Sequence, residues 1–175
     1  SSRHLAGTAA NLILALLCLG ALGALAGFEG PAQAAARLAL GIFLLYGIVG
    51  FLSEVTRFVY RAIGLEVPQN QCAPALSRSA QEFWGSRWNR FVSHWLADLV
   101  FRPLARRRHA VLGILAAFLA SATMHAWIAL VPLGGGAALS MGLYFLVEGL
   151  VVVAEMPLQV HAWPEPVARA WTINV

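Results

Sequence analysis

The sequence predicts an all-α, polytopic membrane protein, a bundle of transmembrane helices with one amphipathic helix at the membrane interface. Two observations carry this prediction. Of the 175 residues, 59% are hydrophobic and 11% are charged, and the mean hydropathy is +0.71, whereas soluble domains average about 45–50% apolar and about 25% charged residues. The apolar residues also gather into long runs, and about 20 such residues in a helix cross the hydrocarbon core of a bilayer.

Four apolar runs are expected to span the membrane, all within a single membrane domain, residues 1–175. They cover residues 5–28, 32–52, 110–131 and 137–154. The first run is uncharged, and the second contains only Arg37 near its start, where a long side chain can reach the interface. Short segments with Gly and Pro separate the first run from the second and the third from the fourth, as turns require.

The long segment between the second and third runs, residues 54–108, is predicted to be cytoplasmic. It contains nine of the twelve basic residues: Arg57, Arg61, Arg78, Arg87, Arg90, Arg102, Arg106, Arg107 and Arg108. Basic loops stay on the cytoplasmic side, so the net charge of +4 reflects topology and contact with anionic lipid rather than nucleic acid. All basic residues are Arg and the chain is rich in Ala, Leu and Gly. This composition favours a bacterial source, so we expect a bacterial inner membrane.

An amphipathic helix in the plane of the interface is predicted to begin at Ser79 and to end at Pro103. Ser79-Ala-Gln-Glu82 is a capping box, with Ser79 as the cap and Glu82 reaching back to it. Apolar residues recur at helical spacing from Trp84 to Val100, and arginines and other polar residues occupy the opposite face. Aromatic residues mixed with arginines are typical of an interfacial helix. The alternative is a solvated helix that packs on a soluble partner.

The C-terminal part of the chain carries an acidic helix face. Tyr144, Glu148 and Glu155, the last just beyond the fourth run, fall on one helix face by spacings of four and seven residues. Residues 161–175 are polar and contain Pro and Trp, and we expect them to be a cytoplasmic connection into a further helix. We therefore expect the chain to be a fragment of a larger polytopic protein.

His125 and Asn89 are the strongest candidates for chemistry. His125 lies in the third apolar run, and an ionisable group at bilayer depth is costly, which indicates a functional site. Burial disfavours the imidazolium and keeps a neutral ring that can act as a general base. Asn89, on the predicted interfacial helix, would stabilise negative charge on a carbonyl or orient the histidine. The alternatives are a histidine that only supports helix packing and an ordinary interfacial asparagine.

Other kinds of site find little support in the sequence. There is no Gly-x-Ser-x-Gly nucleophile elbow for a serine hydrolase. The histidines never pair at three- or four-residue spacing and neither cysteine belongs to a Cys-x-x-Cys motif, so no metal site is predicted. Cys18 lies in the middle of a predicted helix and Cys72 in a loop, so no disulfide framework is expected.

Three motifs follow one another along the chain. They are Phe83-Trp-Gly-Ser-Arg-Trp-Asn89, Ser121-Ala-Thr-Met-His125 and Tyr144-Phe-Leu-Val-Glu-Gly-Leu-Val-Val-Val-Ala-Glu155. Together with the arginine-rich helix between the first two, they resemble the wax synthase-like branch of the membrane-bound O-acyltransferase (MBOAT) family. The resemblance covers residues 77–155 and continues weakly toward residue 172.

The resemblance implies that an acyl group passes from acyl-CoA to a hydroxyl of a lipid or alcohol, forming an ester without a further cofactor. It also implies that His125 is the catalytic base and Asn89 the second catalytic residue. A thioester is already activated, so such an enzyme mainly orients two lipidic substrates and removes one alcohol proton. Cytoplasmic arginines would hold the CoA phosphates. The predicted substrate-binding residues are Trp84, Arg87, Trp88, Arg90 and Glu148.

Two other hypotheses come from different functional classes. A haem- or proton-carrying membrane subunit would use His94, His109 or His125, and a Soret band would reveal the haem. A non-catalytic assembly subunit would use His125 and the face around Glu148 only to hold partner helices, and it would show no acyl transfer.

Overall fold

The structure, a computed structural model, describes residues 2–175, with side chains from residue 6 onward. The described residues form helices and turns and contain no strand, which confirms the predicted all-α class. The chain as described divides into two compact units, Ser1–Gln71 and Cys72–Val175. Within the described part, three helices are long and apolar enough to span a membrane: Ala6–Ala24, Pro31–Ala62 and Ala110–Leu158.

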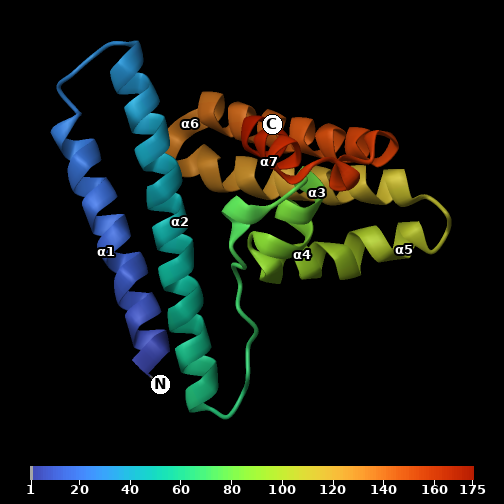
Figure 1. The fold of residues 1–175 in the computed structure, drawn as a ribbon, viewed down its shortest axis with the longest axis horizontal. Helices are drawn as coiled ribbons and strands as arrows, with labels where there is room; N and C mark the ends of the chain where they lie inside the picture. The colour runs from blue at the N-terminus through green and yellow to red at the C-terminus, as the bar shows by residue number, and fades with distance from the viewer. Residues whose placement is uncertain (1) are drawn as a thin grey trace. The chain divides into compact units, whose positions relative to one another are not determined.

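The first unit is built on an antiparallel pair of helices, α1 (Ser2–Ala24) and α2 (Pro31–Ala62) (Figure 1). The two helices lie close together at Gly47, where a Cβ atom would lie 2.9 Å from the carbonyl oxygen of Asn11. Only a residue without a side chain permits this spacing. α2 continues well past residue 52, which is the end of the predicted span, and most large side chains of the pair are exposed, as expected of a surface that faces lipid.

The second unit is dominated by α6 (Ala110–Leu158), which reverses direction in its middle. Gly134 has non-helical backbone angles, φ 81° and ψ 178°, that favour glycine. The two arms on either side of it lie side by side, and they contain the predicted spans 110–131 and 137–154 (Figure 1). At Gly149 the arms are so close that a Cβ atom would lie 2.7 Å from Cβ of Phe118.

The prediction of one continuous interfacial helix from Ser79 to Pro103 is wrong. The segment forms α3 (Ala80–Glu82), the π-helix η2 (Phe83–Arg87), α4 (Arg90–Leu96), the π-helix η3 (Ala97–Phe101) and α5 (Arg102–Ala105). Trp88 is extended and Asn89 is left-handed, so the helix breaks between η2 and α4. Pro103 lies in the first turn of α5, where the ring is tolerated because no backbone donor is needed there.

The predicted helix start is confirmed with one difference. The backbone N–H of Glu82 donates to Oγ of Ser79 at 2.9 Å, as a cap requires. The Glu82 carboxylate accepts instead from the backbone N–H of Arg78, at 2.7 Å, one residue further back than in the usual capping box.

The C-terminal residues are not simply a connection, because α7 (Glu165–Asn174) forms a helix of its own. It follows the 3-10 turn η4 (Val160–Ala162), and Pro164 and a proline in the first turn favour its start. Ala168 on α7 is fully buried. This helix was not predicted from the sequence because the segment is short and polar and has prolines at positions 164 and 166.

Candidate functional site

A cavity of about 290 Å³ lies in the second unit, lined by both arms of α6 and by the broken segment that precedes them. His125 and Asn89, predicted to act together, both line it. Of the described residues that line the cavity, most are apolar and none carries a formal charge. A cavity with this lining suits an apolar substrate, and its few polar groups would orient that substrate.

His125 is held in one orientation by its own helix and by the opposite arm. Its Nδ1 lies 2.8 Å from the carbonyl oxygen of Ser121. A carbonyl oxygen can only accept, so we assign the ring proton to Nδ1, which leaves Nε2 as the basic nitrogen. The ring stacks on Phe145 with 3.9 Å between centroids and 28° between planes. These contacts fix the orientation and the tautomer of the ring.

Asn89 reaches the cavity because the chain breaks there. Its backbone is left-handed, φ 39° and ψ 57°, a conformation that Asn tolerates better than most residues with a side chain. The break redirects the chain between η2 and α4, so that residues of both line the same cavity. The functional role of Asn89 therefore stays a prediction, now supported by its place beside the same cavity as His125.

Trp84 and Trp88 both line the cavity, as expected of substrate-binding residues. The indole Nε1 of Trp84 donates to Oε2 of Glu148 at 2.8 Å, and the Trp84 ring lies 5.4 Å from that of Phe145. Glu148 is 3% exposed and is not among the residues that line the cavity. Its predicted contact with substrate stays untested, and its observed contact is with the Trp84 side chain.

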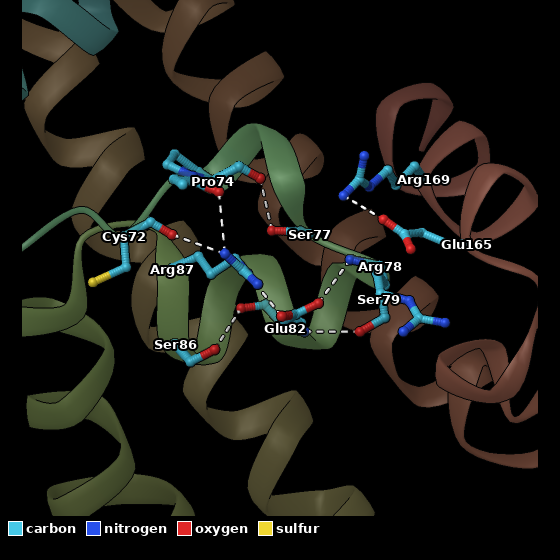
Figure 2. A network of polar contacts seen from close by, with 11 residues as sticks. Cys72, Pro74, Ser77, Arg78, Ser79, Glu82, Ser86, Arg87, Glu165 and Arg169 are labelled. Atoms are coloured by element: carbon cyan, nitrogen blue, oxygen red, sulfur yellow. Dashed lines mark hydrogen bonds and ion pairs between the residues drawn. The ribbon is translucent and has the colours of Figure 1, made fainter.

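Arg87 and Arg90, predicted to bind CoA phosphates, do not line the cavity. Nε of Arg87 donates to Oε1 of Glu82 at 2.7 Å, and its Nη1 donates to the carbonyl oxygen of Cys72 at 3.1 Å (Figure 2). Arg90 lies on the other side of the chain break, with Nη1 3.4 Å from Sγ of Cys72. Arg87 thus ties the start of the second unit to η2, and its role toward CoA stays a prediction.

Glu82 lies at the centre of this network. Burial by itself would raise the pKa of its carboxyl, but the backbone N–H of Arg78 and the side chain of Arg87 stabilise the carboxylate, and the net effect lowers the pKa from 4.5. Glu82 is therefore ionised at neutral pH and holds residues 78–87 together (Figure 2).

Two polar residues of the cavity, Gln81 and Ser93, escaped the sequence analysis. Oγ of Ser93 donates to the carbonyl oxygen of Gly85 at 2.9 Å. Gln81 lies within the capping box and Ser93 on the polar face of the predicted helix, and neither pattern indicates a cavity. Among the described residues, no group of three His, Cys, Asp or Glu side chains is placed to hold a metal ion.

The chain is similar to known acyltransferases. Residues 68–147 match the family described as membrane bound O-acyl transferase. Two similar curated proteins come from Arabidopsis thaliana. Probable long-chain-alcohol O-fatty-acyltransferase 3 is 31% identical over a match that covers 84% of this chain and 44% of the relative. Probable long-chain-alcohol O-fatty-acyltransferase 7 is 26% identical over a match that covers 78% of this chain and 43% of the relative. The chain thus spans less than half the length of these relatives.

No solved structure matches the chain significantly. The relatives are plant proteins, so they lend no support to the bacterial inner membrane expected from composition.

Proposed function

Because the chain belongs to the membrane-bound O-acyltransferase family, in its wax synthase-like branch, we propose that the protein transfers an acyl group from acyl-CoA to the hydroxyl of a lipid or alcohol. One observation carries the proposal beyond the family: His125 and Asn89, from separate elements, line one largely apolar cavity. A long-chain alcohol fits this lining, and the names of the plant relatives point to the same class of acceptor.

In the proposed reaction, Nε2 of His125 removes the proton of the acceptor hydroxyl. The alcohol oxygen attacks the thioester carbonyl carbon, a C–O bond forms and the C–S bond breaks. The CoA thiolate leaves and takes up a proton, for which the imidazolium is the nearest donor. The hydrogen bond from Nδ1 to the Ser121 carbonyl supports the proton transfer, because it fixes the tautomer and stabilises the imidazolium that forms.

Asn89 is proposed to donate a hydrogen bond from its side-chain amide to the carbonyl oxygen as negative charge develops there. A neutral donor suits a cavity without charged lining, because it needs no buried counter-ion. We propose acyl-CoA as the co-substrate and no further cofactor.

The protein is an integral membrane protein, and we propose that residues 54–108 face the cytoplasm, the compartment that supplies acyl-CoA. The exposed cluster at Arg106–Arg108 supports this orientation. Arg87 and Arg90 lie on this segment and are proposed to approach the CoA phosphates, with Trp84, Trp88 and Glu148 on the substrate side.

The test is an ester-forming assay with the full-length protein in membranes, labelled acyl-CoA and a panel of alcohols. His125→Ala is expected to lower the rate by at least about 100-fold, the usual contribution of a general base. His161→Ala is the matched control, because His161 is exposed and does not line the cavity, and its rate should equal that of the wild type.

Two results would contradict the proposal. If His125→Ala retains most of the activity, His125 is not the base. If folded and inserted wild-type protein forms no ester with any acceptor, the assembly-subunit hypothesis takes the place of the acyltransferase.

A further inference from the structure

Glu155, on the second arm of α6, is a buried carboxylate that the proposed reaction does not use. It is 3% exposed. Its Oε1 accepts from the backbone N–H of Ala80 at 2.7 Å and from the indole Nε1 of Trp171 at 2.8 Å, and its Oε2 accepts from the backbone N–H of Gln81 at 2.9 Å. We infer that Glu155 is a positioning residue. It holds the segment that carries Asn89 against the cavity that His125 also lines. This inference rests on the proposed function.

The contacts of Glu155 require a carboxylate. Each observed partner is an N–H donor, and both carboxylate oxygens accept from at least one of them. A glutamine would present an NH₂ group in place of one oxygen, so that two donors would face each other in a buried place. The loss of one acceptor is costly because hydrogen bonds to a charged group are the stronger kind and the abandoned N–H cannot reach water.

The residues that Glu155 holds begin the segment that forms one wall of the cavity. Gln81 and Trp84 line the cavity, and the same segment leads to Asn89. Glu148 lies two helical turns earlier on the same helix face, and it accepts a hydrogen bond from the indole of Trp84. The second arm thus binds the segment by hydrogen bonds at two places, to its backbone through Glu155 and to a side chain through Glu148. His125 lies on the first arm.

Two consequences follow from this arrangement. The relative position of Asn89 and His125 depends on contacts between residues that are distant in sequence, because the segment itself is a short, broken helix with little intrinsic stability. Through Trp171, Glu155 also ties α7 to the start of the same segment. Displacement of α7 would therefore loosen one side of the cavity.

The test combines hydrogen exchange with kinetics of the full-length protein. Glu155→Gln should speed amide exchange in residues 79–89 by about 10- to 100-fold, the effect of losing a hydrogen bond to a charged group, and leave residues 110–130 at the wild-type rate. It should lower kcat for ester formation at least tenfold, with a smaller change in KM. Glu155→Asp, which keeps both oxygens on a shorter stem, should restore part of kcat. Glu165→Gln, on an exposed face of α7, is the matched control.

Three results for Glu155→Gln would each overturn the inference. They are amide exchange at the wild-type rate in residues 79–89, an equal rise in exchange throughout residues 72–175, and an unchanged kcat. If Glu155→Gln does not fold, Trp171→Phe decides, because it keeps the carboxylate and removes one donor. It should raise exchange selectively in residues 79–89 by a smaller factor, and no selective rise would overturn the inference. Absence of ester formation by the wild type would refute the proposed function alone, since the exchange measurement still decides whether Glu155 holds the segment.

Discussion

The left-handed backbone at Asn89 allows its chemical role to be separated from its structural role. In Asn89→Gly the amide is lost but the backbone conformation is free of strain, whereas in Asn89→Ala the amide is lost and a Cβ atom must adopt the left-handed conformation. For an ordinary residue this conformation costs about 1–2 kcal/mol. Asn89→Ala should therefore be less stable than Asn89→Gly by about 1 kcal/mol.

The expected rates differ from the expected stabilities. If the amide stabilises the developing oxyanion, both variants should form ester about 100- to 1000-fold more slowly than the wild type, the usual effect of removing such a donor. The assay is the labelled acyl-CoA reaction at saturating alcohol, combined with the thermal unfolding midpoint in detergent. Gln159 is left-handed too, φ 48° and ψ 43°, and lies outside the cavity. Gln159→Gly should thus gain stability without any change in rate.

A wild-type rate in Asn89→Gly would refute the catalytic role of the amide. Equal stability of the Gly and Ala variants would refute the argument from backbone strain. A slow Ala variant beside a fast Gly variant would show that Asn89 serves only to turn the chain.

Three further predictions concern packing, pH and the buried face of α6. Gly149→Ala should lower the stability of the protein by about 1–3 kcal/mol, because the new methyl group would lie 2.7 Å from Cβ of Phe118. Gly136 has open space around it, so Gly136→Ala should not lower the stability. Unfolding midpoints in detergent distinguish the two variants. The pKa of Glu82 is lowered in the folded protein, so its stabilising contribution is present above its unfolded pKa of about 4.5 and is lost as the pH falls through the folded value. Below about pH 4.5, the thermal unfolding midpoint of the wild type should therefore decrease with falling pH more steeply than that of Glu82→Gln. Glu148→Gln should weaken the hydrogen bond from the indole, and a shift in tryptophan emission would report it; unchanged emission would contradict the assigned contact.

Residues close together in sequence were the predictable part of the site. The capping interaction between Ser79 and Glu82 depends on a three-residue spacing, and it is present. The placement of His125 in an apolar span also follows from local composition. By contrast, a periodic pattern continues through Trp88 and Asn89 without interruption, so it predicts one helix where the structure has two. The break depends on tertiary contacts, such as the donation of the Cys72 N–H to the carbonyl oxygen of Arg87 at 2.9 Å, that no periodicity encodes.

By itself, the sequence determined that this is an all-α membrane protein with long apolar helices and a histidine within one of the apolar runs, because hydropathy and helical periodicity are sums over neighbouring residues. Only the tertiary structure decided which partners meet. The reversal at Gly134 stacks Phe145 on His125, and Glu155 reaches a backbone N–H 75 residues earlier in the chain. Such contacts depend on how helices pack in space, and packing is decided by the shapes and hydrogen-bonding needs of residues that are far apart in sequence.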